Sequence, residues 1–264
     1  MSDSQSLTTT SSSSIATLNV LNLVAYIANV GLVNGVPSLL NLPDNAEVSA
    51  KYQTLVTPAG WAFAIWGLIF LMQAIWSIVQ IAVPAARSNP QVLEGVGKKY
   101  ISVCFFQAAW TFAFGYEQMT LSMAFMLGIL YYLYKIYKAQ QGVADDQDDD
   151  VMDNNASSSS NAAYWLFQFP FGLHLGWIVA ASLVNANLVL VAYGASASFM
   201  YAAAITTVLL AFGVASFTLY TESQKEHSPT VVIPVVLVWA LVSISCYLLL
   251  LLSCSETNFL NDCC

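Results

Sequence analysis

Long apolar stretches alternate with short polar segments along the whole chain. A helix needs about 20 mostly apolar residues to cross a bilayer, and seven stretches approach or exceed this length. The third is the shortest because Glu117 ends it early. The pattern predicts an all-α, polytopic membrane helical bundle. The expected spans are residues 15–36, 61–84, 100–116, 119–138, 164–192, 198–220 and 231–253.

The composition supports this assignment. Of the 264 residues, 58% are hydrophobic and only 8% are charged, whereas soluble domains carry about 25% charged residues. We therefore expect membrane lipid as a partner and no nucleic acid.

The positions of lysine and arginine predict the orientation of the bundle. With seven spans, six of the seven basic residues fall on the same side as the N-terminus, and only Lys51 falls on the opposite side. Because cytoplasmic loops carry the excess of basic residues, we expect a cytoplasmic N-terminus and a luminal or extracellular C-terminus.

Three polar segments lie outside the spans. Residues 1–14 are rich in serine and threonine and have no basic residue, which predicts a disordered tail and not a signal peptide. Residues 139–163 hold an aspartate-rich stretch that lacks the glycine and glutamate of a calcium loop, so we interpret them as a disordered acidic linker. The sequon at Asn155 would then face the cytosol. Cys263 and Cys264 end the chain in a pair that resembles a lipidation signal.

Tryptophan and amide side chains share faces within the second and third spans. Trp66, Phe70 and Gln73 recur at helical spacing in the second span, and Gln107 and Trp110 are neighbours in the third. Polar groups at membrane depth are costly, and they either pair with other helices or serve function. The two faces therefore predict either helix packing or the wall of a pocket.

The fifth span carries the longest such face. His174, Trp177, Ala181 and Asn185 lie at +3, +7 and +11 from the histidine. His174 could ligate haem iron or hydrogen-bond another helix. Gly172 and Gly176 form a GxxxG pair on a neighbouring face, which allows close approach of another helix.

These motifs resemble the tryptophan-rich sensory protein / translocator protein (TspO/MBR) family. The resemblance rests on "TPAGWAFAIWGLIF" at residues 57–70, on "QAAW" at 107–110, and on Trp177 followed by Ala181 and Asn185. It covers roughly residues 17–193. The family's double proline before the second helix is absent here, and the fifth-helix proline is displaced to Pro170.

The resemblance implies a five-helix core over residues 15–193 and a two-helix C-terminal extension over 194–264. It also implies an aromatic pocket for porphyrin, haem or a sterol-like lipid, and often a homodimer. No cofactor is required. Trp66, Trp110 and Trp177 would form the walls, while Gln107 and Asn185 would orient the ligand. Phe70, Gln73, His174 and Ala181 complete the predicted ligand-binding set.

Other functions fit parts of the pattern. A seven-helix small-molecule transporter could use the intramembrane amides, although no span carries a central Asp, Glu or Arg. A structural membrane subunit would use the tryptophans for packing alone. No catalytic triad, metal-ligand spacing or phosphate loop occurs, so we do not expect an enzyme.

Overall fold

In the computed structural model, residues 4–150, 162–224 and 231–257 are described, and every regular element among them is helical. This confirms the predicted all-α fold. The sequon at Asn155 and the cysteines Cys263 and Cys264 lie outside the described residues. The elements are α1 (Ser4–Val30), η1 (Gly31–Gly35), α2 (Val36–Leu39), α3 (Asn45–Lys51), η2 (Gly60–Ala64), α4 (Ile65–Ala82), α5 (Pro84–Arg87), η3 (Gln91–Val96), α6 (Lys99–Gly115), α7 (Met119–Asp150), η4 (Tyr164–Gln168), α9 (Phe169–Ala192), α10 (Ala197–Ser223) and α11 (Val232–Thr257).

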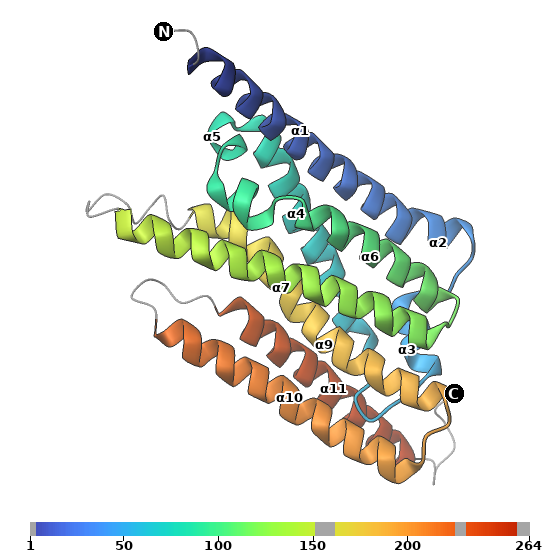
Figure 1. Cartoon of the computed structure of the whole chain (residues 1–264). Helices are drawn as coiled ribbons and strands as arrows, with labels where there is room; N and C mark the ends of the chain where they lie inside the picture. Colours follow the sequence, from blue (N-terminus) through green and yellow to red (C-terminus); the bar gives the residue numbers. More distant parts are fainter. Residues whose placement is uncertain (1–3, 151–161, 225–230, 258–264) are drawn as a thin grey trace.

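The long helices run side by side as one bundle (Figure 1). α1 lies at one edge against α4 and α6, and α10 lies at the other edge against α9 and α11. α9 contacts α4, α7, α10 and α11, so it is the central helix. Large apolar side chains of α10 remain exposed, as expected of a helix that faces lipid.

Six helical segments are long and apolar enough to cross a membrane, and each matches a predicted span. The remaining predicted span corresponds to α6, which has 17 residues and is therefore about 25 Å long. This lies at the lower limit for a spanning helix. α6 packs along α7 and α1 within the bundle (Figure 1), and we treat it as the seventh span. The chain is an integral, multi-pass membrane protein.

Two helices extend further than the sequence analysis expected. α1 begins at Ser4, inside the stretch for which a disordered tail is predicted, and α7 continues to Asp150, inside the predicted acidic linker. Adding residues to an existing helix is much easier than starting one. The end of α7 is also held by Gln140, which is buried, donates to the carbonyl of Phe167 and accepts at its own carbonyl from Gln91.

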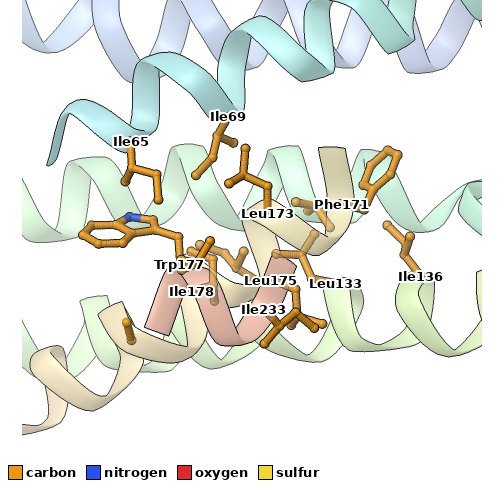
Figure 2. Close-up of a cluster of buried hydrophobic side chains, with 14 of the residues drawn as sticks. Ile65, Ile69, Leu133, Ile136, Phe171, Leu173, Leu175, Trp177, Ile178 and Ile233 are labelled. Atoms are coloured by element: carbon orange, nitrogen blue, oxygen red, sulfur yellow. The ribbon is translucent and has the colours of Figure 1, made fainter. Parts of the chain in front are cut away.

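The core is formed by buried side chains from α4, α6, α7, α9 and α11. Trp76, Tyr100 and Phe171 come from three different helices, and their ring centroids are 4.9–5.6 Å apart in edge-to-face arrangements. Figure 2 shows the next layer, where Ile69 of α4 meets Leu173 of α9. These contacts connect the centre of the bundle over several turns.

Polar side chains attach α1 to the bundle. Asn19, Asn22, Tyr26 and Asn29 follow one helical face, and each donates a hydrogen bond to a group on another element. The acceptors include the carbonyls of Gln80 and Phe70 and the side chain of Gln107. This polar face was not predicted from the sequence.

α9 and α11 approach most closely at the GxxxG pair. A Cβ atom built on Gly172 would lie 2.7 Å from Val232 Cγ1, and one built on Gly176 would lie 3.2 Å from the Cα of Ile233. The close approach that this glycine pair predicts is therefore present, and α11 is the partner helix.

An ion pair joins α3 to the turn between α6 and α7. Lys51 Nζ lies 2.6 Å from Glu117 Oε1, and the Tyr52 hydroxyl donates to Glu117 Oε2 at 2.7 Å. Glu117 has a positive φ of 58°, which an L-residue adopts only with support from its surroundings. The hydrogen bonds from Lys51 and Tyr52 hold the pKa of the Glu117 carboxyl below its usual value.

We expect Gly176→Val to destabilise the bundle, because its added atoms meet the backbone of α11. Overpacking of this kind costs about 1–3 kcal/mol. Gly213→Val is the matched control, since a Cβ at Gly213 meets nothing within 4 Å. Thermal unfolding in nanodiscs should show a lower Tm for Gly176→Val than for the control, and equal Tm values would contradict the close contact.

We also expect the Glu117 ion pair to make stability depend on pH. Because its folded-state pKa is lowered, the stabilisation is present above the ordinary pKa of glutamate and is lost as the pH falls through the lowered value. The effect is small because the pair is partly exposed. In acid melts followed by circular dichroism, Glu117→Gln should flatten this dependence, whereas Glu94→Gln, which changes an exposed residue, should not.

Candidate ligand-binding site

A cavity lies where α4, α6 and α9 meet α11, and it extends to α3 and α7. It encloses about 500 Å³ between atoms, including the space at its opening. Most of its wall is apolar. The lining residues are Ser49, Pro58, Phe63, Trp66, Trp110, Phe114, Met126, Trp177, Ala180, Ala181, Val184, Asn185, Leu188, Ala240 and Ile244.

Five aromatic rings form a continuous series along the wall. Trp66 is central, with its ring centroid 6.1 Å from that of Trp110 and 6.3 Å from that of Trp177. Phe63 continues the series beyond Trp177 at 5.9 Å, and Phe114 stacks on Trp110 at 5.0 Å. Figure 2 shows Trp177 on α9 beneath Ile65 of α4. The tryptophans that helical spacing placed on one face of each of α4, α6 and α9 therefore meet in the structure.

Among the residues that the structure describes, the three indole nitrogens of this wall have no hydrogen-bond partner. Nε1 of Trp66, Trp110 and Trp177 are all buried donors without an acceptor, and the buried hydroxyl of Ser49 is likewise unpaired. A buried donor that lacks an acceptor costs about 1–3 kcal/mol. Unpaired donors that lie together on the wall of one cavity are suited to a ligand that supplies hydrogen-bond acceptors.

Asn185 lines the cavity, but its amide already has partners. Its side chain exchanges hydrogen bonds of 3.2 Å with the hydroxyl of Ser122 on α7. It therefore joins α9 to α7 next to the cavity, in addition to the ligand-orienting role that the sequence analysis expected.

Gln73 and His174 lie behind the aromatic wall and do not line the cavity. The Tyr100 hydroxyl donates to Gln73 Oε1 at 3.1 Å, and Gln73 Nε2 lies 2.9 Å from His174 Nδ1. Because the amide nitrogen is the donor, Nδ1 accepts, and the imidazole proton is on Nε2. The His174 ring meets the Trp66 ring edge to face, with centroids 5.6 Å apart. This hydrogen-bonded series of three polar side chains packs against the side of Trp66 that faces away from the cavity.

The other two predicted residues also lie outside the lining. Phe70 packs behind Trp66 at 6.1 Å between centroids. Gln107 Oε1 accepts from Asn29 Nδ2 at 2.9 Å, so this amide attaches α1 to α6. Of the nine predicted residues, the cavity wall contains Trp66, Trp110, Trp177, Ala181 and Asn185.

Several lining residues were not predicted. Phe63 lies three residues before Trp66, so helical periodicity could have indicated it, whereas the spacing of four from Trp110 does place Phe114 on the aromatic face of the third span. Ala240 and Ile244 of α11 carry no such signal, because that helix is apolar on every side.

The lining contains no Asp, Glu, His, Cys or Lys among the described residues. Within the same part of the chain, His, Cys, Asp and Glu side chains form no group that could hold a metal ion. The wall can therefore stack on a ligand and hydrogen-bond to it, but its described groups form no recognisable acid–base or metal constellation.

A family model described as "TSPO-like protein" matches residues 16–248. The match continues past residue 193, where the predicted five-helix core ends, through α10 and into α11. No curated protein and no solved structure matches the chain.

We expect Gln73→Leu to destabilise the protein, because it leaves the Tyr100 hydroxyl and His174 Nδ1 without their partner. A loss of about 1–3 kcal/mol is the usual cost of such buried groups. Gln118→Leu, at an exposed position in the α6–α7 turn, serves as the control. Thermal unfolding in nanodiscs should give a lower Tm for Gln73→Leu than for Gln118→Leu. An unchanged Tm for Gln73→Leu would contradict a supporting role for the Tyr100–Gln73–His174 hydrogen bonds.

Proposed function

The chain belongs to the TSPO-like protein family, and we propose that it binds a flat, apolar ligand in the aromatic cavity, as a sensor, carrier or shuttle. A porphyrin, haem or a sterol-like lipid has this chemistry. The ligand would be cargo or signal and not a resident cofactor, and we propose binding without catalysis.

The continuous series of five rings carries this proposal. Aromatic side chains bind planar ring systems by stacking and by edge-to-face contact. Ligand sites are typically apolar clefts with a few polar groups that fix orientation. The cavity has this character, because its wall is apolar apart from Ser49, Asn185 and the indole nitrogens.

The unpaired indole donors narrow the ligand class. A ligand that carries carbonyl, carboxylate or hydroxyl oxygens would give Nε1 of Trp66, Trp110 or Trp177 the acceptor that the protein does not supply. A pure hydrocarbon would leave these donors unpaired. We therefore favour ring ligands with oxygen acceptors, a description that porphyrins and sterols both meet.

Of the amides Gln73, Gln107 and Asn185, only Asn185 lines the cavity, so the other two give no support to the transporter alternative. Gln73 and Gln107 pair with side chains of neighbouring helices and do not line the cavity. The structural-subunit alternative makes a different prediction, because packing tryptophans would affect stability and bind no ligand.

We also propose that the N-terminus is cytoplasmic. The support is the distribution of basic residues, six of which fall on the side of the N-terminus. The one remaining lysine, Lys51, is engaged with Glu117.

We expect Trp66→Ala and Trp177→Ala to weaken protoporphyrin binding about tenfold or more, because each removes a ring from the wall. Fluorescence titration of purified protein in nanodiscs measures the Kd. Trp165→Ala is the matched control, since Trp165 is an exposed tryptophan on η4 and does not line the cavity.

A cavity-filling variant tests the same site without removing a tryptophan. Ala181→Leu should block binding while the bundle stays folded, and Ala202→Leu, at an exposed position on α10, should bind as the wild type does. Saturable binding that is lost in all three cavity variants supports the proposal. Flat titrations of folded wild-type protein with protoporphyrin, haem and cholesterol would overturn it in favour of a structural role.

A further inference from the structure

The last helix forms one wall of the cavity. Ala240 and Ile244 of α11 line it together with Ala180 and Ala181 of α9. The two helices are in close contact one to two turns away, at Gly176, where the backbone of α11 lies against α9. The cavity therefore occupies the space that opens between α9 and α11 beyond this contact.

A segment that we call the strap, residues 54–64, lies beside α11 at this opening. Its shape is fixed locally, because Thr54 N donates to Thr57 Oγ1 at 2.7 Å and Val56 N donates to Thr54 Oγ1 at 3.1 Å. Pro58, within the strap, lines the cavity. Figure 1 shows the loop that follows α3 passing next to α11.

Three directional contacts join the strap to α11, and Val56 of the strap also shares a buried apolar cluster with Ile244 of α11. Ala59 N donates to the carbonyl of Ser243 at 3.2 Å, and Trp239 Nε1 donates to the carbonyl of Ala62 at 3.2 Å. The rings of Trp61 and Trp239 meet edge to face with centroids 4.7 Å apart. All three lie within a turn or two of the cavity residues Pro58, Ala240 and Ile244.

The two tryptophans of this contact differ from those of the cavity wall. Trp61 and Trp239 are 45% and 39% exposed, so they lie on the outer surface of the bundle, which faces lipid. Within the lining, Leu188 and Met126 are almost completely buried, whereas Phe63, Trp66, Ala181 and Val184 are partly buried. At the strap the cavity is separated from the exterior by one short segment and its contacts with α11.

We propose that the Trp61–Trp239 pair is a gate, and that the strap and α11 separate there to admit the ligand from the bilayer. The identity of the ligand rests on the proposed function, whereas the gate itself does not. An apolar ligand concentrates in the hydrocarbon of the membrane, so a route through the lipid-facing surface spares it any transfer through water. Opening requires the loss of two hydrogen bonds, one ring contact and the apolar packing between Val56 and Ile244, a change of the kind that other loops and lids undergo.

A cysteine inside the cavity reports on the gate without any ligand. Ser49→Cys is nearly isosteric, and Ser49 is a buried lining residue. The full-length protein in nanodiscs is treated with N-ethylmaleimide, and modification of residue 49 is followed over time by peptide mass spectrometry. Native cysteines are resolved as separate peptides.

In this background, Trp239→Ala should speed modification of residue 49 about tenfold, because it removes both a hydrogen bond and a ring contact. Trp239→Phe keeps a ring and loses only the donor, so its effect should be smaller, about threefold. Trp61→Ala is an independent second variant, and Trp165→Ala is the control that should change nothing. Unchanged rates in the folded Trp239 and Trp61 variants would overturn the gate.

Protoporphyrin exchange, measured by stopped-flow fluorescence, separates the gate from the proposed function. A gate predicts that Trp239→Ala raises the association and dissociation rates together and leaves the Kd within about twofold. A change in dissociation alone would make Trp239 part of the wall and would overturn its role as a gate. Faster cysteine modification without any porphyrin binding would support the gate and reject the porphyrin as ligand.

Discussion

The contact between α9 and α11 at Gly172 and Gly176 determines where the cavity lies. Helices in lipid gain little from the hydrophobic effect when they associate, so they depend on close packing and on hydrogen bonds between them. Here the missing Cβ atoms let the backbone of α11 reach α9. One to two turns further along the two helices, small residues such as Ala181 and Ala240 line the cavity. The glycine contact therefore places α11 beside the cavity.

Polar side chains inside the bundle fall into two physical classes. Gln73, Gln107 and Asn185 have partners on other helices, and these bonds hold α4, α6, α7, α9 and α1 in place. The indoles of the cavity wall have none. Since an unpaired polar group is costly where water is absent, the first class stabilises the fold, and we propose that the second binds the ligand. Depth in the membrane alone does not distinguish the two classes.

That distinction explains what the sequence could and could not predict. The length of the apolar stretches identified the spans. Helical spacing placed Trp66, Trp110 and Trp177 on aromatic faces of their helices, and in the structure these three side chains meet. Helical spacing gives the direction of a side chain on its own helix. It does not show which residues line the cavity and which lie behind them once the helices pack. His174 shares a face with Trp177 yet lies behind Trp66. The contribution of α11 was hidden for another reason, because a uniformly apolar helix has no face that a pattern could reveal.

The two last helices also change the physical character of the site. The aromatic wall comes from η2, α4, α6 and α9, whereas closure at the lipid-facing side comes from α11 and the strap. For the ligand that we propose, affinity would depend mainly on the rings, since they provide the contact area. Exchange would depend on the contacts that must break for the cavity to open. Because four of the five wall rings lie outside the strap and α11, a substitution of Trp239 would alter how fast a ligand enters and leaves more than how tightly the wall holds it. The region matched by the family model includes α10 and most of α11, which places this closing element within the shared architecture and not outside it.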